Sequence, residues 1–148
     1  MAIINERISS LALPRSDCAA LNKKQLDELL SAVKPVIGNP FGGVVMQNFS
    51  VADLQPEGVI AKLKSLDIAE KDVLVCWPAF AEGFRMRWSV FLAHLDDLWY
   101  PSSDDVIVIS SKGLWALELT HEETVRLLRL KTAKQEEIRK IAFSLTAD

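Results

Sequence analysis

The stretch from Val73 to Val90 reads VLVCWPAFAEGFRMRWSV and holds the clearest structural signals in the chain. Its first five residues form a continuous apolar run that Pro78 ends, and such a run predicts a buried strand. Its second part has an apolar side chain at every other position, at Phe84, Met86, Trp88 and Val90. Arginine or serine stands between them, so this part predicts a half-buried strand with one polar face.

Further strands are expected on both sides of this stretch. The apolar runs at 106–109 and 115–119 flank a short turn and predict a hairpin. A short strand is expected near residues 44–47. Residues 124–130 fit either a last strand or a helix, because they are rich in Leu and Val without glycine. Thr120-His121-Glu122-Glu123 just before them matches the capping-box pattern that can begin a helix.

Four segments have a helical pattern. Asn22 and Gln25 form a potential capping pair, and an apolar stripe follows at Leu26, Leu29, Leu30 and Val33. Pro35 and Gly38 are expected to end this helix. A second helix is expected from Pro56, a third from Ser89 as its N-cap to Trp99, and a fourth from Thr132 to the C-terminal region.

The chain has 148 residues, which predicts a single domain over residues 1–148. We expect an α+β fold, in which an antiparallel or mixed sheet of about four to five strands packs with helices from both chain ends. The predicted core consists of Leu26, Leu30, Leu63, Val73, Val75, Trp77, Met86, Trp88, Leu95, Val106, Val108 and Leu117.

Composition narrows the classes of function. The formal net charge is −3 and the pI about 5.4, which argues against nucleic-acid binding because phosphates need Lys and Arg. No apolar run approaches the ~18 residues of a membrane span. The two cysteines, Cys18 and Cys76, form no Cys-x-x-Cys motif, and the N-terminal residues do not have the pattern of a signal peptide. We therefore expect a cytoplasmic protein.

Readable catalytic motifs are absent from the sequence. It contains no Gly-x-Ser-x-Gly, no His-Glu-x-x-His and no P-loop, and the glycine-rich residues 38–43 are typical of a turn. No catalytic residue, metal ligand or cofactor is assigned on this basis. Catalytic groups can be scattered along a chain, so the missing motifs disfavour an enzyme without excluding one.

One local feature is unusual, the acidic-aromatic stretch LDDLWYPSSDD at residues 95–105. Its candidate partner-binding residues are Asp96, Asp97, Tyr100, Asp104 and Asp105. Converging carboxylates could face a basic protein, with aromatic side chains as anchors, or could bind a hard cation. The structural alternative is a helix-to-strand turn made by Pro, Ser and Asp, with Trp99 in the core.

The two histidines and two of the arginines also allow both a functional and a structural interpretation. His94 and Asp97 would share one side of a helix and could form an acid–base pair, whereas His121 is expected to be exposed. Arg85 and Arg87 share one strand face and could hold a phosphate or carboxylate. Alternation alone also predicts polar residues at these two positions, and we favour a solvated or acid-covered face.

Three hypotheses about function follow. The first is a non-catalytic protein-binding domain, for example an inhibitor or immunity-type protein that masks a basic partner. The second is a small metal-dependent hydrolase that uses the carboxylates between Asp96 and Asp105. The third is a structural or self-associating domain. The acidic-aromatic stretch and the missing catalytic motifs favour the first.

Overall fold

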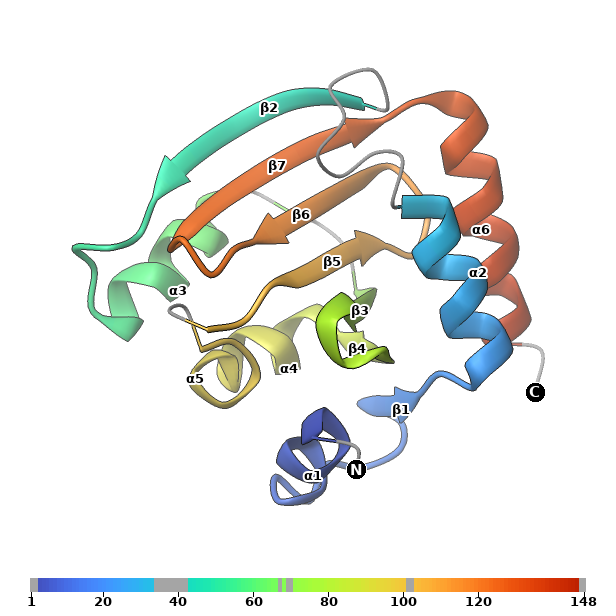
Figure 1. Cartoon of the computed structure of the whole chain (residues 1–148), viewed down its shortest axis with the longest axis horizontal. Coiled ribbons are helices and arrows are strands. Elements are labelled where there is room, and N and C mark those ends of the chain that lie inside the picture. The colour runs from blue at the N-terminus through green and yellow to red at the C-terminus, as the bar shows by residue number, and fades with distance from the viewer. Residues whose placement is uncertain (1–2, 34–42, 67, 69–70, 101–102, 147–148) are drawn as a thin grey trace.

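The computed structural model describes residues 3–33, 43–66, 68, 71–100 and 103–146 (Figure 1). The strands are β1 (Cys18–Ala20), β2 (Gly43–Ser50), β3 (Asp72–Trp77), β4 (Glu82–Arg87), β5 (Val106–Ser110), β6 (Trp115–Leu119) and β7 (Thr124–Leu130). The helices are α1 (Ile3–Ser9), α2 (Lys23–Val33), α3 (Pro56–Lys64), α4 (Trp88–Ala93), α5 (Leu95–Leu98) and α6 (Thr132–Thr146). A short 3-10 helix covers Pro78–Phe80.

The strands form one seven-stranded sheet in the order β1-β4-β3-β5-β6-β7-β2. Every neighbouring pair is antiparallel. The segment from β5 through β7 is a continuous meander, which confirms the predicted hairpin of residues 106–119. Two edges result: the three-residue β1 on one side and the eight-residue β2 on the other.

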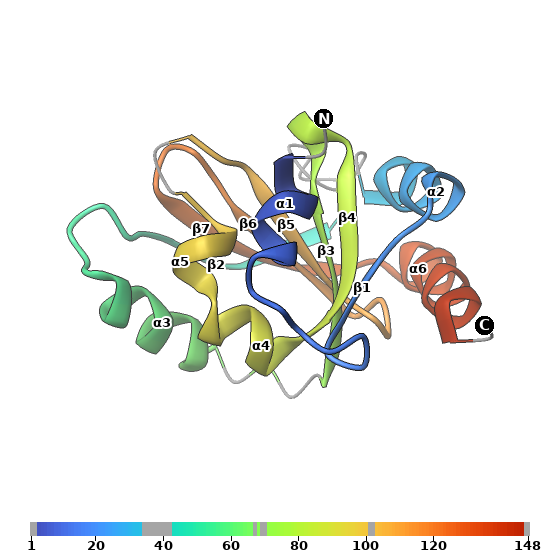
Figure 2. The ribbon, with the colours of Figure 1, turned by 90° about the horizontal axis from the view of Figure 1, so that it is seen from below.

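Helices cover both faces of the sheet. Figure 2 shows α2 and α6 on one face, and α1, α3, α4 and α5 on the other. The buried side chains accordingly form two clusters, and β3 contributes to both. Val73, Val75 and Trp77 belong to one cluster, and Leu74 and Cys76 to the other. A strand covered on both faces has no polar side, which explains why residues 73–77 form a continuous apolar run.

The predicted α+β class agrees with the structure, but the predicted strand count of four to five is wrong. β1 is only three residues long and lies in an N-terminal region without a clear periodic pattern. β7 is the segment that the sequence left open between strand and helix, and it is a strand. Both are fixed by pairing with distant partners, β1 with β4 and β7 with β2 and β6.

The beginning of α2 confirms the predicted capping pair. The backbone N–H of Gln25 donates to Asn22 Oδ1 at 2.8 Å, and the backbone N–H of Asn22 donates to Gln25 Oε1 at 3.0 Å. These reciprocal bonds satisfy amide groups that have no partner within the helix. The predicted stop signals Pro35 and Gly38, and residues 38–42 of the predicted turn, lie outside the described residues.

Two predicted helix starts are wrong. The strand β4 ends at Arg87, although the apolar alternation continues to Val90. Arg87 is the N-cap of α4 and Trp88 is its first residue, so the predicted N-cap Ser89 lies inside the helix. The expected helix also divides at His94, where α4 ends and α5 begins. Residues 120–123 form a tight turn between β6 and β7 in which Glu123 has φ 61°, so no helix begins there.

The predicted core residues are buried except Leu30, which is partly buried. In α2 the neighbouring Leu29 is completely buried. Among the described helices, none is long and apolar enough to cross a membrane.

Candidate functional site

Asp104 is a buried structural residue, with 2% of its surface exposed. Its Oδ2 accepts a hydrogen bond from Arg7 Nη1 at 2.7 Å and from the backbone N–H of Tyr100 at 3.2 Å. Its backbone carbonyl accepts a bond from Trp99 Nε1 at 3.1 Å. One aspartate therefore connects α1, the end of α5 and the beginning of β5.

Tyr100 is exposed, and the same arginine lies over one face of its ring. The Arg7 guanidinium carbon lies 4.0 Å from the centroid of the Tyr100 ring, and 5.9 Å from that of Phe80. Asp104 accepts a hydrogen bond from the Tyr100 backbone and pairs with Arg7, so it holds both the backbone of Tyr100 and the cation that contacts its ring. An aromatic side chain with 41% exposure on a backbone held in this way is suited to act as a binding anchor.

The other candidate aspartates occupy two different environments. Asp96 and Asp97 are exposed on the short helix α5. Asp105 is also exposed, but its Oδ1 accepts hydrogen bonds from the backbone N–H of His121 at 2.8 Å and pairs with His121 Nδ1 at 2.9 Å. Asp104 and Asp105 thus have different cationic partners, Arg7 and His121.

The contact of Asp105 with His121 fixes the turn between β6 and β7. The bond raises the pKa of His121, and the negative charges of Asp105 and then Glu122 act in the same direction. Within the turn, the N–H of Glu123 donates to the carbonyl of Thr120 at 3.0 Å. The carbonyl of Glu123 accepts a hydrogen bond from the backbone N–H of Val51 at 2.8 Å, and this bond joins the turn to the end of β2.

These elements surround a hollow of about 360 Å³, which we call the Tyr100 groove. It lies between the segment that follows β2, the first residues of α3, the helix α5 and the turn before β7. Its lining residues are Val51, Ala52, Leu54, Pro56, Val59, Leu95, Asp96, Trp99, Tyr100 and Glu123. Leu54 and Tyr100 are among the exposed large apolar side chains of the described chain.

The charged side chains that line the Tyr100 groove are all acidic. Its only charged lining residues are Asp96 and Glu123, and the described lining contains no Lys, Arg or His. The other lining residues are aliphatic or aromatic. Such a surface favours a ligand that presents an apolar stem with a positive end, because the stem is removed from water while the charge meets carboxylates.

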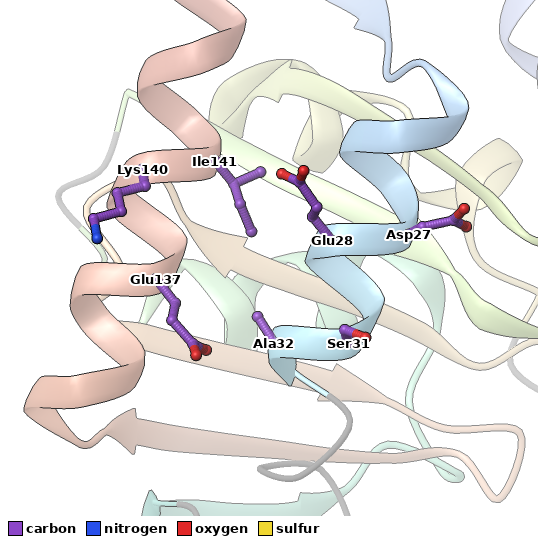
Figure 3. A pocket seen from close by; sticks show the side chains of 7 residues that line it. All are labelled: Asp27, Glu28, Ser31, Ala32, Glu137, Lys140 and Ile141. Carbon is purple, nitrogen blue, oxygen red and sulfur yellow. The ribbon is translucent and has the colours of Figure 1, made fainter.

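A larger hollow of about 530 Å³ lies between α2 and α6 (Figure 3). Its lining residues are Asp27, Glu28, Ser31, Ala32, Glu137, Lys140 and Ile141. Figure 3 shows Asp27 pointing away from α6 and Lys140 pointing away from α2, so these charged ends do not meet in the groove. It has no aromatic lining, which makes it a weaker binding candidate than the Tyr100 groove.

The remaining candidates from the sequence have structural partners. Arg85 pairs with Asp72 at 3.2 Å and also donates to the carbonyls of Arg15 and Ser16. Arg87 pairs with Asp17 at 3.3 Å. Each arginine on this strand face therefore has its own carboxylate.

His94 is partly buried at the junction of α4 and α5, where its carbonyl accepts the N–H of Asp97 at 3.0 Å. This is a backbone contact that supports the helix. Within the described residues, no group of three or more His, Cys, Asp and Glu side chains could hold a metal ion.

Sequence reasoning missed Arg7 and Glu123. Arg7 is 97 positions away from Asp104, in an N-terminal region whose pattern is unclear, so no local signal connects them. Glu123 was placed in a predicted capping box, although its backbone is left-handed. The glutamate pair in Thr120-His121-Glu122-Glu123 fits a helix start and a turn equally well.

Comparisons with known protein families, curated proteins and solved structures found no match to this chain.

Proposed function

We propose that this chain is a non-catalytic protein-binding domain, of the inhibitor or immunity type, that binds a basic protein partner through the Tyr100 groove. The observation that carries the proposal is the groove's composition. Its described lining is mostly apolar, includes the exposed Tyr100, and contains only acidic residues among the charged ones. The net charge of −3 acts in the same direction over longer range.

A lysine or arginine side chain of the partner fits this chemistry. Its methylene stem would contact Leu54, Tyr100 and neighbouring apolar atoms, and its charged end would approach Asp96 or Glu123. Aromatic residues at the centre of an interface often contribute much of the binding free energy. We therefore assign Tyr100 as the anchor, Asp96 as the first charged contact, and Asp97 as an adjacent exposed carboxylate.

Two of the predicted partner-binding residues receive indirect roles in this proposal. Asp104 positions Tyr100 through its backbone contact and through Arg7. Asp105 positions the turn that carries Glu123, by its two bonds to His121. Substitution of either residue would thus change the groove without removing a direct contact.

The experiment is affinity capture from an extract of the native host, with the captured proteins identified by mass spectrometry. Wild-type protein is compared with Tyr100→Ala and Asp96→Asn. We expect a basic protein that the wild type retains and that Tyr100→Ala loses. With the purified partner, the affinity of the chain should be about 30-fold or more lower for Tyr100→Ala than for the wild type. The decrease for Asp96→Asn should be smaller.

The matched control is Asp27→Asn, which removes an exposed carboxylate on α2, outside the Tyr100 groove. This variant has the same change in net charge as Asp96→Asn but leaves the Tyr100 groove intact. Equal weakening by Asp27→Asn and Asp96→Asn would show a general charge effect. Equal binding by the wild type and Tyr100→Ala would contradict the proposed function.

A further inference from the structure

The edge strand β2 has neither charge nor proline along its length, and in the described part of the chain its outer side pairs with no strand. It pairs with β7 and with no other strand of the described chain (Figure 1). Its eight residues read GVVMQNFS and contain neither a charged residue nor proline. Sheet edges are commonly protected by charged side chains, proline or a covering element, because an open row of N–H and C=O groups can pair with another strand.

Three successive apolar side chains of β2 are exposed: Val44 by 60%, Val45 by 44% and Met46 by 50%. We call these residues the edge triad. The register shifts between Val45 and Gln47, so Met46 lies opposite no residue of β7. A bulge can itself blunt an edge, but this one adds an apolar residue to the exposed row.

We propose that two copies of this chain associate through β2, paired antiparallel about a twofold axis at Val45. This register places Val45 opposite Val45 of the second copy, and Val44 opposite Met46. It gives each side chain of the edge triads a cross-strand apolar neighbour, which covers part of the exposed apolar surface, and it sets no charged residues of β2 against each other, because the strand has none. A second copy is therefore a chemically matched occupant of this edge.

The other edge of the sheet, formed by β1, is too short to extend the assembly beyond a dimer. β1 has only three residues and cannot match the length of β2. Pairing of β2 with β2 uses the same surface on both copies, so it closes at a dimer and leaves no long edge open. A contact through a single strand is small, so we expect a dissociation constant on the order of 10–100 µM.

The first measurement is sedimentation velocity across a concentration series of the full chain. We expect a monomer–dimer equilibrium for the wild type and at least a tenfold weaker association for Val45→Lys, which sets two positive charges against each other. The control is Leu114→Lys, since Leu114 is another apolar residue with 44% exposure and lies outside β2. A wild-type monomer at several hundred micromolar would overturn the proposal, as would unchanged association of Val45→Lys.

A cross-linking experiment tests the register and does not depend on the folding of the lysine variant. Both native thiols are buried, so Val45→Cys adds one exposed thiol. At the twofold axis the two new thiols would be within disulfide range, because directly opposed residues have Cα atoms about 4.5–5.5 Å apart. We expect a covalent dimer after mild oxidation. Ser50→Cys, on the same strand but far from the axis, should form no covalent dimer; equal cross-linking of both variants would refute the register.

Discussion

Asp104 shows how similar carboxylates can differ in their roles. Asp96, Asp97, Asp104 and Asp105 lie in one short stretch, and the sequence does not distinguish their roles. In the fold only Asp104 is buried, and it pairs with a residue 97 positions earlier. Local sequence allowed a turn as one interpretation of the stretch, but it could not predict the partner of Asp104, because a long-range contact depends on the complete topology.

We predict that Asp104→Asn destabilises the protein by about 2–3 kcal/mol, since it removes the charged partner of the mostly buried Arg7. Chemical denaturation in urea measures the change. Asp97→Asn is the control, and it should stay within about 0.5 kcal/mol of the wild type because Asp97 is exposed. Similar losses in the two variants would contradict the assigned difference in role.

The His121–Asp105 contact gives a prediction about pH. The hydrogen bond to Asp105 raises the pKa of His121 above its usual 6.5, so folding favours the protonated ring. The stabilising contribution is fully present below pH 6.5 and is lost as the pH rises through the raised pKa. An NMR titration of the His121 ring should give a lower midpoint in Asp105→Asn than in the wild type. The same midpoint in both proteins would disprove the contact.

The two thiols report on different parts of the sheet. Burial raises the pKa of Cys18 to about 11 and that of Cys76 to about 12. Neither thiol should react readily with a disulfide reagent at pH 8, because the thiolate is the reactive form. In mild denaturant we expect Cys18 to react first, since β1 is a three-residue edge strand. Mass spectrometry of partly labelled protein would show the order, and earlier labelling of Cys76 would contradict it.

At the scale of elements, sequence patterns succeeded where the stabilising contacts are local. The capping pair of Asn22 and Gln25 lies within one turn of α2, and its hydrogen bonds form as predicted. The boundary between β4 and α4 was misplaced, because Trp88 is apolar and fits both the strand alternation and a helix face. Residues 124–130 were ambiguous for a similar reason, and pairing with β2 and β6 determines that they form a strand.

The turn between β5 and β6 gives a test at this scale. Gly113 has φ 74°, and a Cβ atom there would lie 2.5 Å from the backbone oxygen of Gln135 in α6. Gly113→Ala should therefore lower the free energy of unfolding by about 2–4 kcal/mol, because alanine strains the backbone at this φ and its Cβ atom displaces α6. Thermal unfolding measures the loss.

The matched control is Gly58→Ala in α3. A Cβ atom at Gly58 would meet only Leu54 side-chain atoms, at 3.5 Å or more, which is ordinary contact. Alanine also favours helix over glycine by up to about 1 kcal/mol, so this variant should be neutral or more stable. A comparable loss of stability in both alanine variants would contradict the close approach of the turn to α6.

At the scale of the whole molecule, the α+β class followed from the sequence but the layer arrangement did not. The continuous apolar run of β3 predicted a buried strand, and the two clusters of buried side chains that β3 joins show that both of its faces are covered. The Tyr100 groove was not predictable, because it combines residues 51–59, 95–100 and 123. Only the part at Asp96 and Tyr100 had a recognisable signal, the aromatic residue beside carboxylates.

The central claim is that a basic protein partner occupies the Tyr100 groove. Hydrogen–deuterium exchange of the chain, alone and with the captured partner, tests it most directly. We predict slower exchange in residues 51–59, 95–100 and 120–124, with little change in α2 and α6. Protection confined to α2 and α6, or to β2, with unchanged exchange around Tyr100, would contradict the claim.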